Sequence, residues 1–89
     1  MEKIFEDIKA ERAVQDEQWG GAAHDDQHGP EDFLKFIRWQ SAKFEQEVEA
    51  KSAEQLVMLS DIDNMARPRL VKIAALAVAA IESIDRKTK

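Results

Sequence analysis

The most restrictive feature of this 89-residue sequence is an alanine-rich apolar segment at residues 70–81. Lys72 is its only charged residue, and five of its twelve residues are alanine. Alanine favours helix, and a helix that is apolar almost all round is buried on most of its sides. We predict that this helix begins at Pro68, ends near Lys87, and lies either in the centre of the fold or against a second subunit. Because small side chains allow close helix approach, we expect a homo-oligomer.

Length and composition restrict the class of protein further. A chain of 10.1 kDa can bury one small core, so residues 1–89 are predicted to form a single helical domain. The sequence has no cysteine, which excludes disulfides and thiolate metal sites. It has no apolar run of about 18 residues that could span a membrane. The first residues lack the pattern of a signal peptide. We therefore expect a cytoplasmic protein with no membrane partner.

Turn and cap residues divide the sequence into four predicted helices. Gly20-Gly21 ends the first helix, and a loop at residues 19–29 follows it. Pro30 suits the first position of the second helix, and the two acids after it favour a helix N-terminus. The expected ranges are residues 2–18, 30–51, 53–65 and 68–87.

The third of these helices is predicted from Ser52 and Gln55, which resemble a capping box. Its apolar side chains would face inward: Leu56, Val57, Leu59 and Ile62. No segment alternates between apolar and polar residues in the manner of a strand. The sequence thus predicts an all-α protein, a small antiparallel bundle of three to four helices.

Charge is distributed unevenly along the chain, whose formal net charge is −5. Residues 1–32 carry ten acids and three bases, whereas residues 67–89 carry two acids and six bases. A net acidic chain does not favour duplex nucleic acid, because affinity for a duplex comes mainly from neutralised phosphates. The acidic N-terminal third suits a cation or a basic partner. Alternatively, it pairs with the basic end of the same chain.

The loop at residues 19–29 concentrates the side chains that bind metals when cysteine is absent. Imidazole and carboxylate are the usual ligands of Zn²⁺ and Mn²⁺, and carboxylates suit Mg²⁺. One hypothesis is therefore a divalent cation (Mg²⁺, Mn²⁺ or Zn²⁺) as cofactor. The alternative is that these side chains cap the next helix and bond loop amides. The candidate ligands are His24, Asp25, Asp26 and His28, assisted by Glu11 or Asp16.

Arg67 and Arg69 flank Pro68 at the predicted start of the last helix. Cations there oppose the helix dipole, and together with free helix amides they could bind the phosphates of a nucleotide. The alternative is that both arginines pair with the acidic N-terminal third. An up-down-up-down bundle places the loop and the two arginines at one end. It places Glu82 and Asp85 at the other end.

Two tryptophans are candidate interface residues. Trp19 abuts the loop, and Trp39 lies two residues away from the main apolar stripe of its helix. A tryptophan that is partly exposed often anchors a protein–protein contact.

Two parts of the sequence resemble a family of small proteins of tailed bacteriophages and prophages. The first is Glu11-Arg12-x-x-Gln15-x-x-x-Trp19-Gly20, continued by His24-Asp25-Asp26-x-His28. The second is the last helix, Arg69 to Ala77 and Ala80 to Arg86. Together they cover about half of the chain. The family is largely of unassigned function, so the resemblance implies a phage protein acting in the cytoplasm of an infected bacterium.

A second likeness is to the MazG-like nucleoside triphosphate pyrophosphohydrolases, which are all-α. These enzymes hold magnesium with a Glu-x-x-Glu motif and a later Glu-x-x-Asp motif. Glu82-x-x-Asp85 matches the second motif, whereas the sequence has no Glu-x-x-Glu pair before it. This departure leaves the metal cage of the family incomplete.

Two classes of function follow. The favoured one is an inhibitor or binding module, which would block a host enzyme or defence complex through its acidic N-terminal third and the 19–29 loop. The alternative is a metal-dependent nucleotide-binding protein or pyrophosphohydrolase-like enzyme, in which metal-activated water would attack a phosphoanhydride. Whether the chain is an enzyme stays open at this point. We lean against catalysis because 89 residues offer little enclosure for a water-excluding site.

Overall fold

The structure is a computed structural model that describes residues 1–54 and 56–88. All regular elements of this part of the chain are α-helices, which confirms the predicted all-α bundle. No helix in the described residues is long and apolar enough to cross a membrane. The elements are α1 (Glu2–Trp19), α2 (Gly21–Asp25), α3 (Pro30–Ser52) and α4 (Leu59–Lys87).

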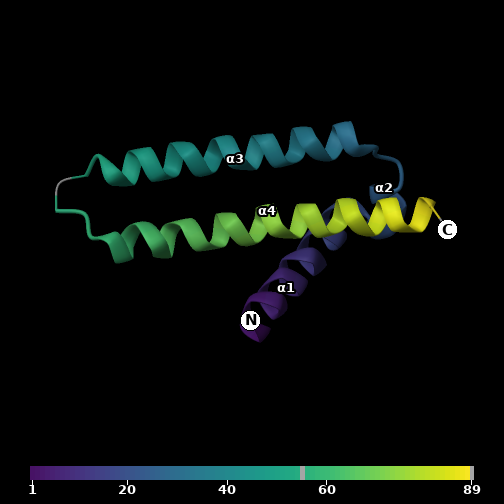
Figure 1. Ribbon diagram of the computed structural model, residues 1–89, viewed down its shortest axis with the longest axis horizontal. Coiled ribbons are helices and arrows are strands. Elements are labelled where there is room, and N and C mark those ends of the chain that lie inside the picture. Colours follow the sequence, from purple (N-terminus) through teal and green to yellow (C-terminus); the bar gives the residue numbers. More distant parts are fainter. Residues whose placement is uncertain (55, 89) are drawn as a thin grey trace.

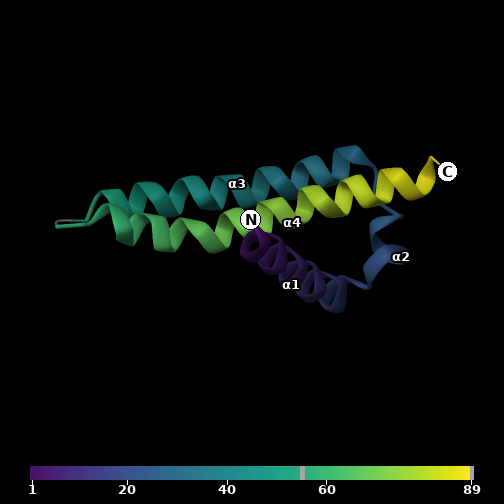
Figure 2. The same cartoon turned by 60° about the horizontal axis from the view of Figure 1, so that its bottom comes forward.

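Helix α4 is the centre of the fold. It pairs with α3 in an antiparallel hairpin, and α1 packs obliquely against it while running in the same general direction (Figures 1 and 2). Within the described residues, the backbones of α1 and α3 both contact α4 but do not contact each other. The apolar helix thus takes the central position that was one of the two predicted for it.

The ends of α1 and α3 lie where the sequence predicted them. Gly20 has φ 95° and donates its N–H to Asp16 O at 2.9 Å, and Gly21 follows with φ 67°. Glycine adopts left-handed conformations with little strain, so Gly20 and Gly21 can end α1 at little energetic cost. Gly29 is extended at the N-cap of α3, and Pro30 takes its first position.

The predicted third helix at residues 53–65 is wrong. Ser52 is the last residue of α3, residues 53–58 connect α3 to α4, and Leu59 begins α4. Leu56 has φ 61°, and both Leu56 and Leu59 are exposed rather than inward. Gln55, the other half of the proposed capping box, lies outside the described residues. A short helix without tertiary packing is only marginally stable in water. Lengthening α3 and α4 instead adds packing contacts between them.

The predicted start of the last helix at Pro68 is also wrong, because α4 continues through Pro68. A proline inside a helix removes one hydrogen bond and crowds the preceding turn, at a cost of about 3 kcal/mol. Contacts on both sides of Pro68 hold the helix against its neighbours. Arg67 pairs with Asp7 of α1, and Arg69 bonds to Glu47 of α3. Surface ion pairs alone are too weak to offset this penalty, so the packing of α4 along α3 and α1 must keep the helix continuous.

The buried core is small for three long helices. Among the described residues, only Phe33, Ala75, Leu76 and Ala79 are buried apolar side chains, and two of these are alanines of α4. The molecule is elongated, with extents of 52 × 28 × 21 Å. Many larger apolar side chains consequently remain at the surface.

Candidate functional site

Arg12 of α1 lies at the junction of three helices. Its guanidinium is 3.2 Å from the carboxylate of Asp16 and 3.3 Å from that of Asp25 in α2. Its Nε lies 3.6 Å from Glu82 Oε1 of α4. Arg12 and Asp25 are both largely removed from solvent. One arginine therefore links α1, α2 and α4 through three carboxylates.

The neighbours of Arg12 in the Glu11-Arg12-x-x-Gln15 motif also have structural roles. Gln15 is buried, and its Oε1 accepts a hydrogen bond from Arg12 at 3.4 Å. Glu11 accepts one from Lys72 Nζ of α4 at 2.9 Å. The contact between Glu11 and Lys72 thus holds α1 against α4.

The end of the 19–29 loop is fastened to the C-terminal end of α4. Asp26 pairs with Arg86 at 2.8 Å and accepts a hydrogen bond from Ser83 Oγ at 3.1 Å. Ser83 is buried and also lies 3.3 Å from the backbone oxygen of Asp25. Lys87 donates to the backbone oxygen of His28 at 2.7 Å.

These contacts predict how stability depends on acid. Arg86 and Ser83 hold the pKa of Asp26 below its usual 3.8. A carboxylate with a lowered pKa in the folded state stabilises fully above its unfolded pKa, and this contribution disappears as the pH falls through the folded pKa. We expect the melting temperature to fall below about pH 4. The fall should be smaller in Asp26→Asn, as measured by circular dichroism melts from pH 7 to pH 2.

Glu31→Gln is the matched control, since Glu31 is an exposed acid outside these contacts. It should keep the wild-type dependence on acid. An Asp26→Asn variant with the same acid dependence as the wild type would show that the pair with Arg86 does not form in solution.

His28 takes part in the start of α3. Its Nδ1 lies 3.1 Å from Asp32 Oδ2, and this contact lowers the pKa of Asp32. The His28 ring also meets Phe36 edge-on, with ring centres 5.3 Å apart. The side chain of His24, the other imidazole of the loop, lies outside the described part of the chain.

The described carboxylates of the proposed metal site contact basic side chains. Glu11 contacts Lys72, Asp16 and Asp25 share Arg12, and Asp26 contacts Arg86. Within the described residues, no group of three histidine or acidic side chains is arranged to hold a metal ion. The centre of the acidic cluster is occupied by the guanidinium of Arg12.

The prediction that the loop lies beside Arg67 and Arg69 is wrong. The loop contacts residues 83–87, about 21–30 Å along α4 from the two arginines at 1.5 Å per residue. Glu82, which was predicted to lie at the far end, instead contacts Arg12 near the loop. Because residues 53–65 form no separate helix, the chain reverses direction one time fewer than predicted. Helix α4 therefore runs opposite to the direction predicted for the last helix.

Arg67 and Arg69 also lie inside α4 rather than at its start, so no free helix amides accompany them. Arg67 lies 2.7 Å from Asp7, which confirms pairing with the acidic third for this residue. Arg69 instead contacts α3, through Glu47 at 2.7 Å and Gln40. The proposed phosphate clamp therefore loses its geometric basis.

Part of the acidity of residues 1–32 is paired inside the chain. At least six of its ten acids contact a basic side chain. Three of these contacts reach residues 67–89, as the intrachain alternative predicted: Asp7 with Arg67, Glu11 with Lys72 and Asp26 with Arg86. The other three stay within residues 1–32, because Asp16 and Asp25 contact Arg12 and Asp32 contacts His28. Glu2, Glu6, Glu17 and Glu31 are exposed.

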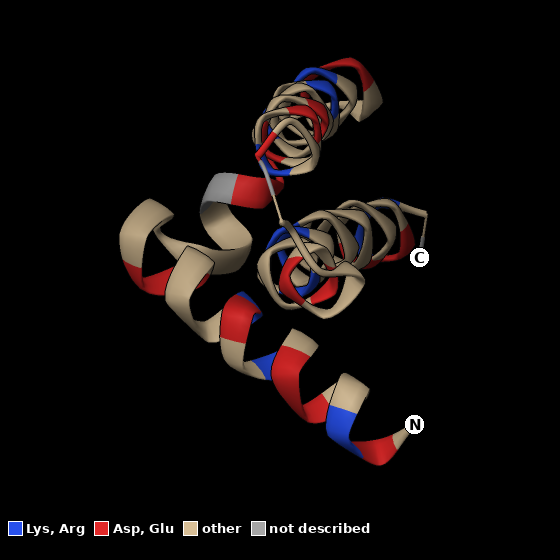
Figure 3. Cartoon of the chain, turned by 90° about the vertical axis from the view of Figure 1, so that its left-hand side faces the viewer, with Lys and Arg blue, Asp and Glu red and all other residues tan. Residues whose placement is uncertain are grey.

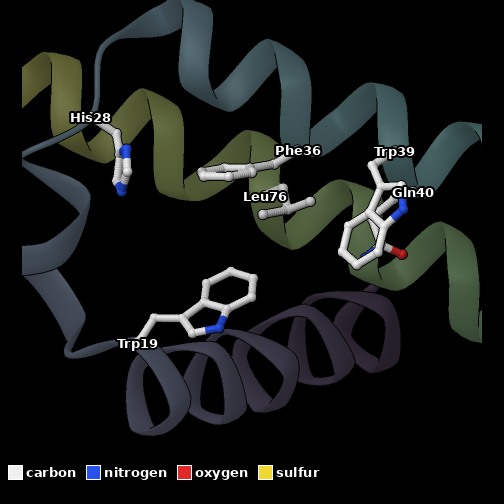
Figure 4. Close-up of a pocket in the computed structure, with 6 residues that line it drawn as sticks. All are labelled: Trp19, His28, Phe36, Trp39, Gln40 and Leu76. Carbon is white, nitrogen blue, oxygen red and sulfur yellow. The ribbon is translucent and has the colours of Figure 1, made fainter.

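The two candidate interface tryptophans meet at one pocket. It has a volume of about 320 Å³ and lies where the end of α1, the start of α3 and the middle of α4 approach each other. Trp19 reaches from α1 toward Phe36, with ring centres 6.2 Å apart, and Trp39 closes the opposite side (Figure 4). The lining residues are Trp19, His28, Phe36, Trp39, Gln40 and Leu76.

The pocket walls are aromatic and partly fixed. Lys43 Nζ lies 3.9 Å from the centre of the Trp39 ring, a cation–π contact that restrains the indole. Phe36, Gln40 and Leu76 were not predicted as site residues. The i, i+3, i+4 spacing of Phe36, Trp39 and Gln40 was the available signal, because it places all three on neighbouring parts of one helix face.

Comparisons with protein-family models, with curated proteins and with solved structures gave no match. The functional argument therefore depends on the geometry of this chain.

Proposed function

We propose that this protein is a binding module without chemistry of its own, which takes an apolar or aromatic side chain of a partner protein into the pocket between Trp19 and Trp39. The observation that carries the proposal is this half-open aromatic pocket. Its volume lies at the lower end of the range of ligand sites. That size suits one inserted side chain better than a nucleotide.

Exposure of the two indoles supports this assignment. Trp19 is 41% and Trp39 is 59% exposed, although burying a tryptophan is strongly favourable. Tryptophans at the edge of a pocket are typical residues that dominate the energy of protein–protein contacts. A partner that covered them would bury apolar surface that the chain alone leaves in water.

Charge gives a second criterion for the partner. Glu17 is exposed two residues before Trp19, and Glu31 is exposed at the start of α3. With the net charge of −5, these acids would favour a partner whose inserted side chain is surrounded by basic residues. Following the resemblance to phage proteins, the proposed partner is a host bacterial protein, met in the cytoplasm of the infected cell. A second copy of the chain is a further proposed partner, on another face.

The metal-dependent nucleotide alternative is not proposed as a second function. It requires the loop carboxylates and the arginine pair in one place. They lie apart, and each described carboxylate of the set already contacts a base.

The test is capture of host proteins with immobilised wild-type chain, Trp39→Ser and Trp19→Ser. We expect the wild type to retain a partner at physiological salt. Each tryptophan variant should bind the purified partner at least about 30-fold more weakly, since such residues contribute about 2 kcal/mol or more. Because the sequence has only two tryptophans and both line the pocket, the partner should also shift the intrinsic fluorescence of the wild type.

Phe5→Ser is the matched control, because Phe5 is exposed to a similar degree on α1 but does not line the pocket. It should bind as the wild type does. Capture of no partner, or equal binding by Trp39→Ser, would refute the proposal.

A further inference from the structure

The isolated chain exposes more surface than a folded protein of its mass should. Its accessible surface is 6417 Å² for 10.1 kDa. The scaling for folded monomers gives about 5,300 Å² at this mass. The excess is about 1,100 Å², and a standard interface covers about 800 Å² on each partner. The surplus is therefore of the size that one dimer interface removes.

The shape of the molecule gives the same result. Its radius of gyration is 15.0 Å. A compact domain of this length has a radius of about 12 Å. The long α3/α4 hairpin is packed by α1 and α2 on one side only, as the end-on view in Figure 3 shows. The opposite side of the hairpin is the place where a further layer is missing.

An apolar stripe on α4 lies on this uncovered side. Leu70, Ile81 and Ile84 are 48%, 58% and 43% exposed. At 100° per residue they share one face with Ala74 and Ala77. The same spacing places this face well away from Lys72, which contacts α1, and from Arg69, which contacts α3. We call the five residues 70, 74, 77, 81 and 84 the α4 stripe.

Helix α3 extends the apolar surface. Leu34 is exposed and lies about 140° around α3 from Trp39, which lines the pocket on the α1 side. The contact between Arg69 and Glu47 sets the antiparallel register of the hairpin. In that register Leu34 lies level with the region of Ile81. The uncovered face is therefore continuous across both helices.

We propose that a second copy of this chain covers the α4 stripe, forming a two-fold symmetric dimer in which the two α4 helices cross antiparallel at Ala77. The stripe is symmetric about that residue, because Leu70 and Ile84 each lie seven positions from it. An antiparallel crossing therefore places Leu70 against Ile84 of the partner subunit. A surface that matches its own copy in this way is what a two-fold interface requires.

Side-chain size and charge fit the same arrangement. Ala74 and Ala77 leave little bulk at the centre, so the helices can approach closely, and the larger side chains pack on either side. Arg67 and Asp85 are exposed at opposite ends of one edge of the stripe. The crossing brings Arg67, which also contacts Asp7 of its own α1, near Asp85 of the partner subunit. This approach of opposite charges favours the antiparallel direction over the parallel one.

The test combines oligomeric state with introduced cysteines, because the natural sequence has none. Sedimentation velocity at about 100 µM should show the wild type as a dimer. At this concentration both weak and strong dimers are populated. Ile84→Asp should shift it to monomer. Ile4→Asp is the matched control, because Ile4 on α1 is also 43% exposed, and it should stay dimeric.

Ala77→Cys should form a disulfide-linked dimer under mild oxidation, since the two-fold axis brings the two sulfurs together. Ala13→Cys, on the exposed side of α1, should not. The cross-link reports on the wild-type arrangement even if Ile84→Asp fails to fold. A monomeric wild type, dissociation by Ile4→Asp alone, or equal cross-linking at both positions would overturn the proposal. These outcomes are independent of the pocket, which lies on the opposite side of the hairpin.

Discussion

Replacing Arg12 by methionine is expected to lower the free energy of unfolding by about 3–5 kcal/mol, because it leaves the buried carboxylate of Asp25 without its cation. Asp25 is 6% exposed, and Asp16 and Glu82 would lose the same partner. The loss is a large fraction of the stability of a small domain. Urea unfolding followed by circular dichroism measures it, at one fixed protein concentration because dimerisation would add to apparent stability.

Two further variants distinguish the loss of this buried cluster from the loss of an ordinary surface ion pair. Lys3→Met removes the exposed pair between Lys3 and Asp7 and should leave the free energy of unfolding almost unchanged. Adding Asp25→Asn to Arg12→Met should restore part of the stability, since it removes the uncompensated charge. If Arg12→Met costs no more than Lys3→Met, the cluster does not hold the three helices together.

Replacing Leu76 by alanine is expected to destabilise the chain by about 2–5 kcal/mol, because it opens a cavity in a core with few alternatives. Leu76 is 2% exposed and is the only leucine, isoleucine or valine among the buried described residues. It also forms one wall of the aromatic pocket, so its loss should enlarge the pocket and change the tryptophan fluorescence. The same urea titration provides the measurement.

Leu59→Ala is the corresponding surface variant, since Leu59 is exposed in the first turn of the same helix. We expect a change within about 0.5 kcal/mol. Similar losses in both variants would mean that helix propensity rather than packing holds α4.

The predictions that succeeded depend on local signals. Gly20-Gly21 and Pro30 act through the φ angles of their own residues, so the limits of α1 and α3 could be predicted without knowing the fold. The predictions that failed used local signals where distant contacts decide. Pro68 is a strong start signal in isolation, yet packing against α1 and α3 keeps α4 continuous through it.

The candidate site shows the same division. Trp19 and Trp39 were identified singly, but they are twenty residues apart on different helices, and only the packing of α1 and α3 against α4 brings them to one pocket. The sequence singled out the loop acids as candidate ligands. Their partners could not be predicted, because the direction of α4 decides whether Asp26 meets Arg86 or an arginine near Pro68.

The sequence by itself determined that the chain is helical, that its alanine-rich segment lies at the centre of the fold or against a second subunit, and that its charges are unevenly shared between its ends. These properties follow from composition and spacing, which act within a few residues. The tertiary structure alone decided which acid meets which base, where the tryptophans converge, and which face of α4 stays uncovered. Each of these depends on how many times the chain reverses, and a single connection at residues 53–58 sets that number.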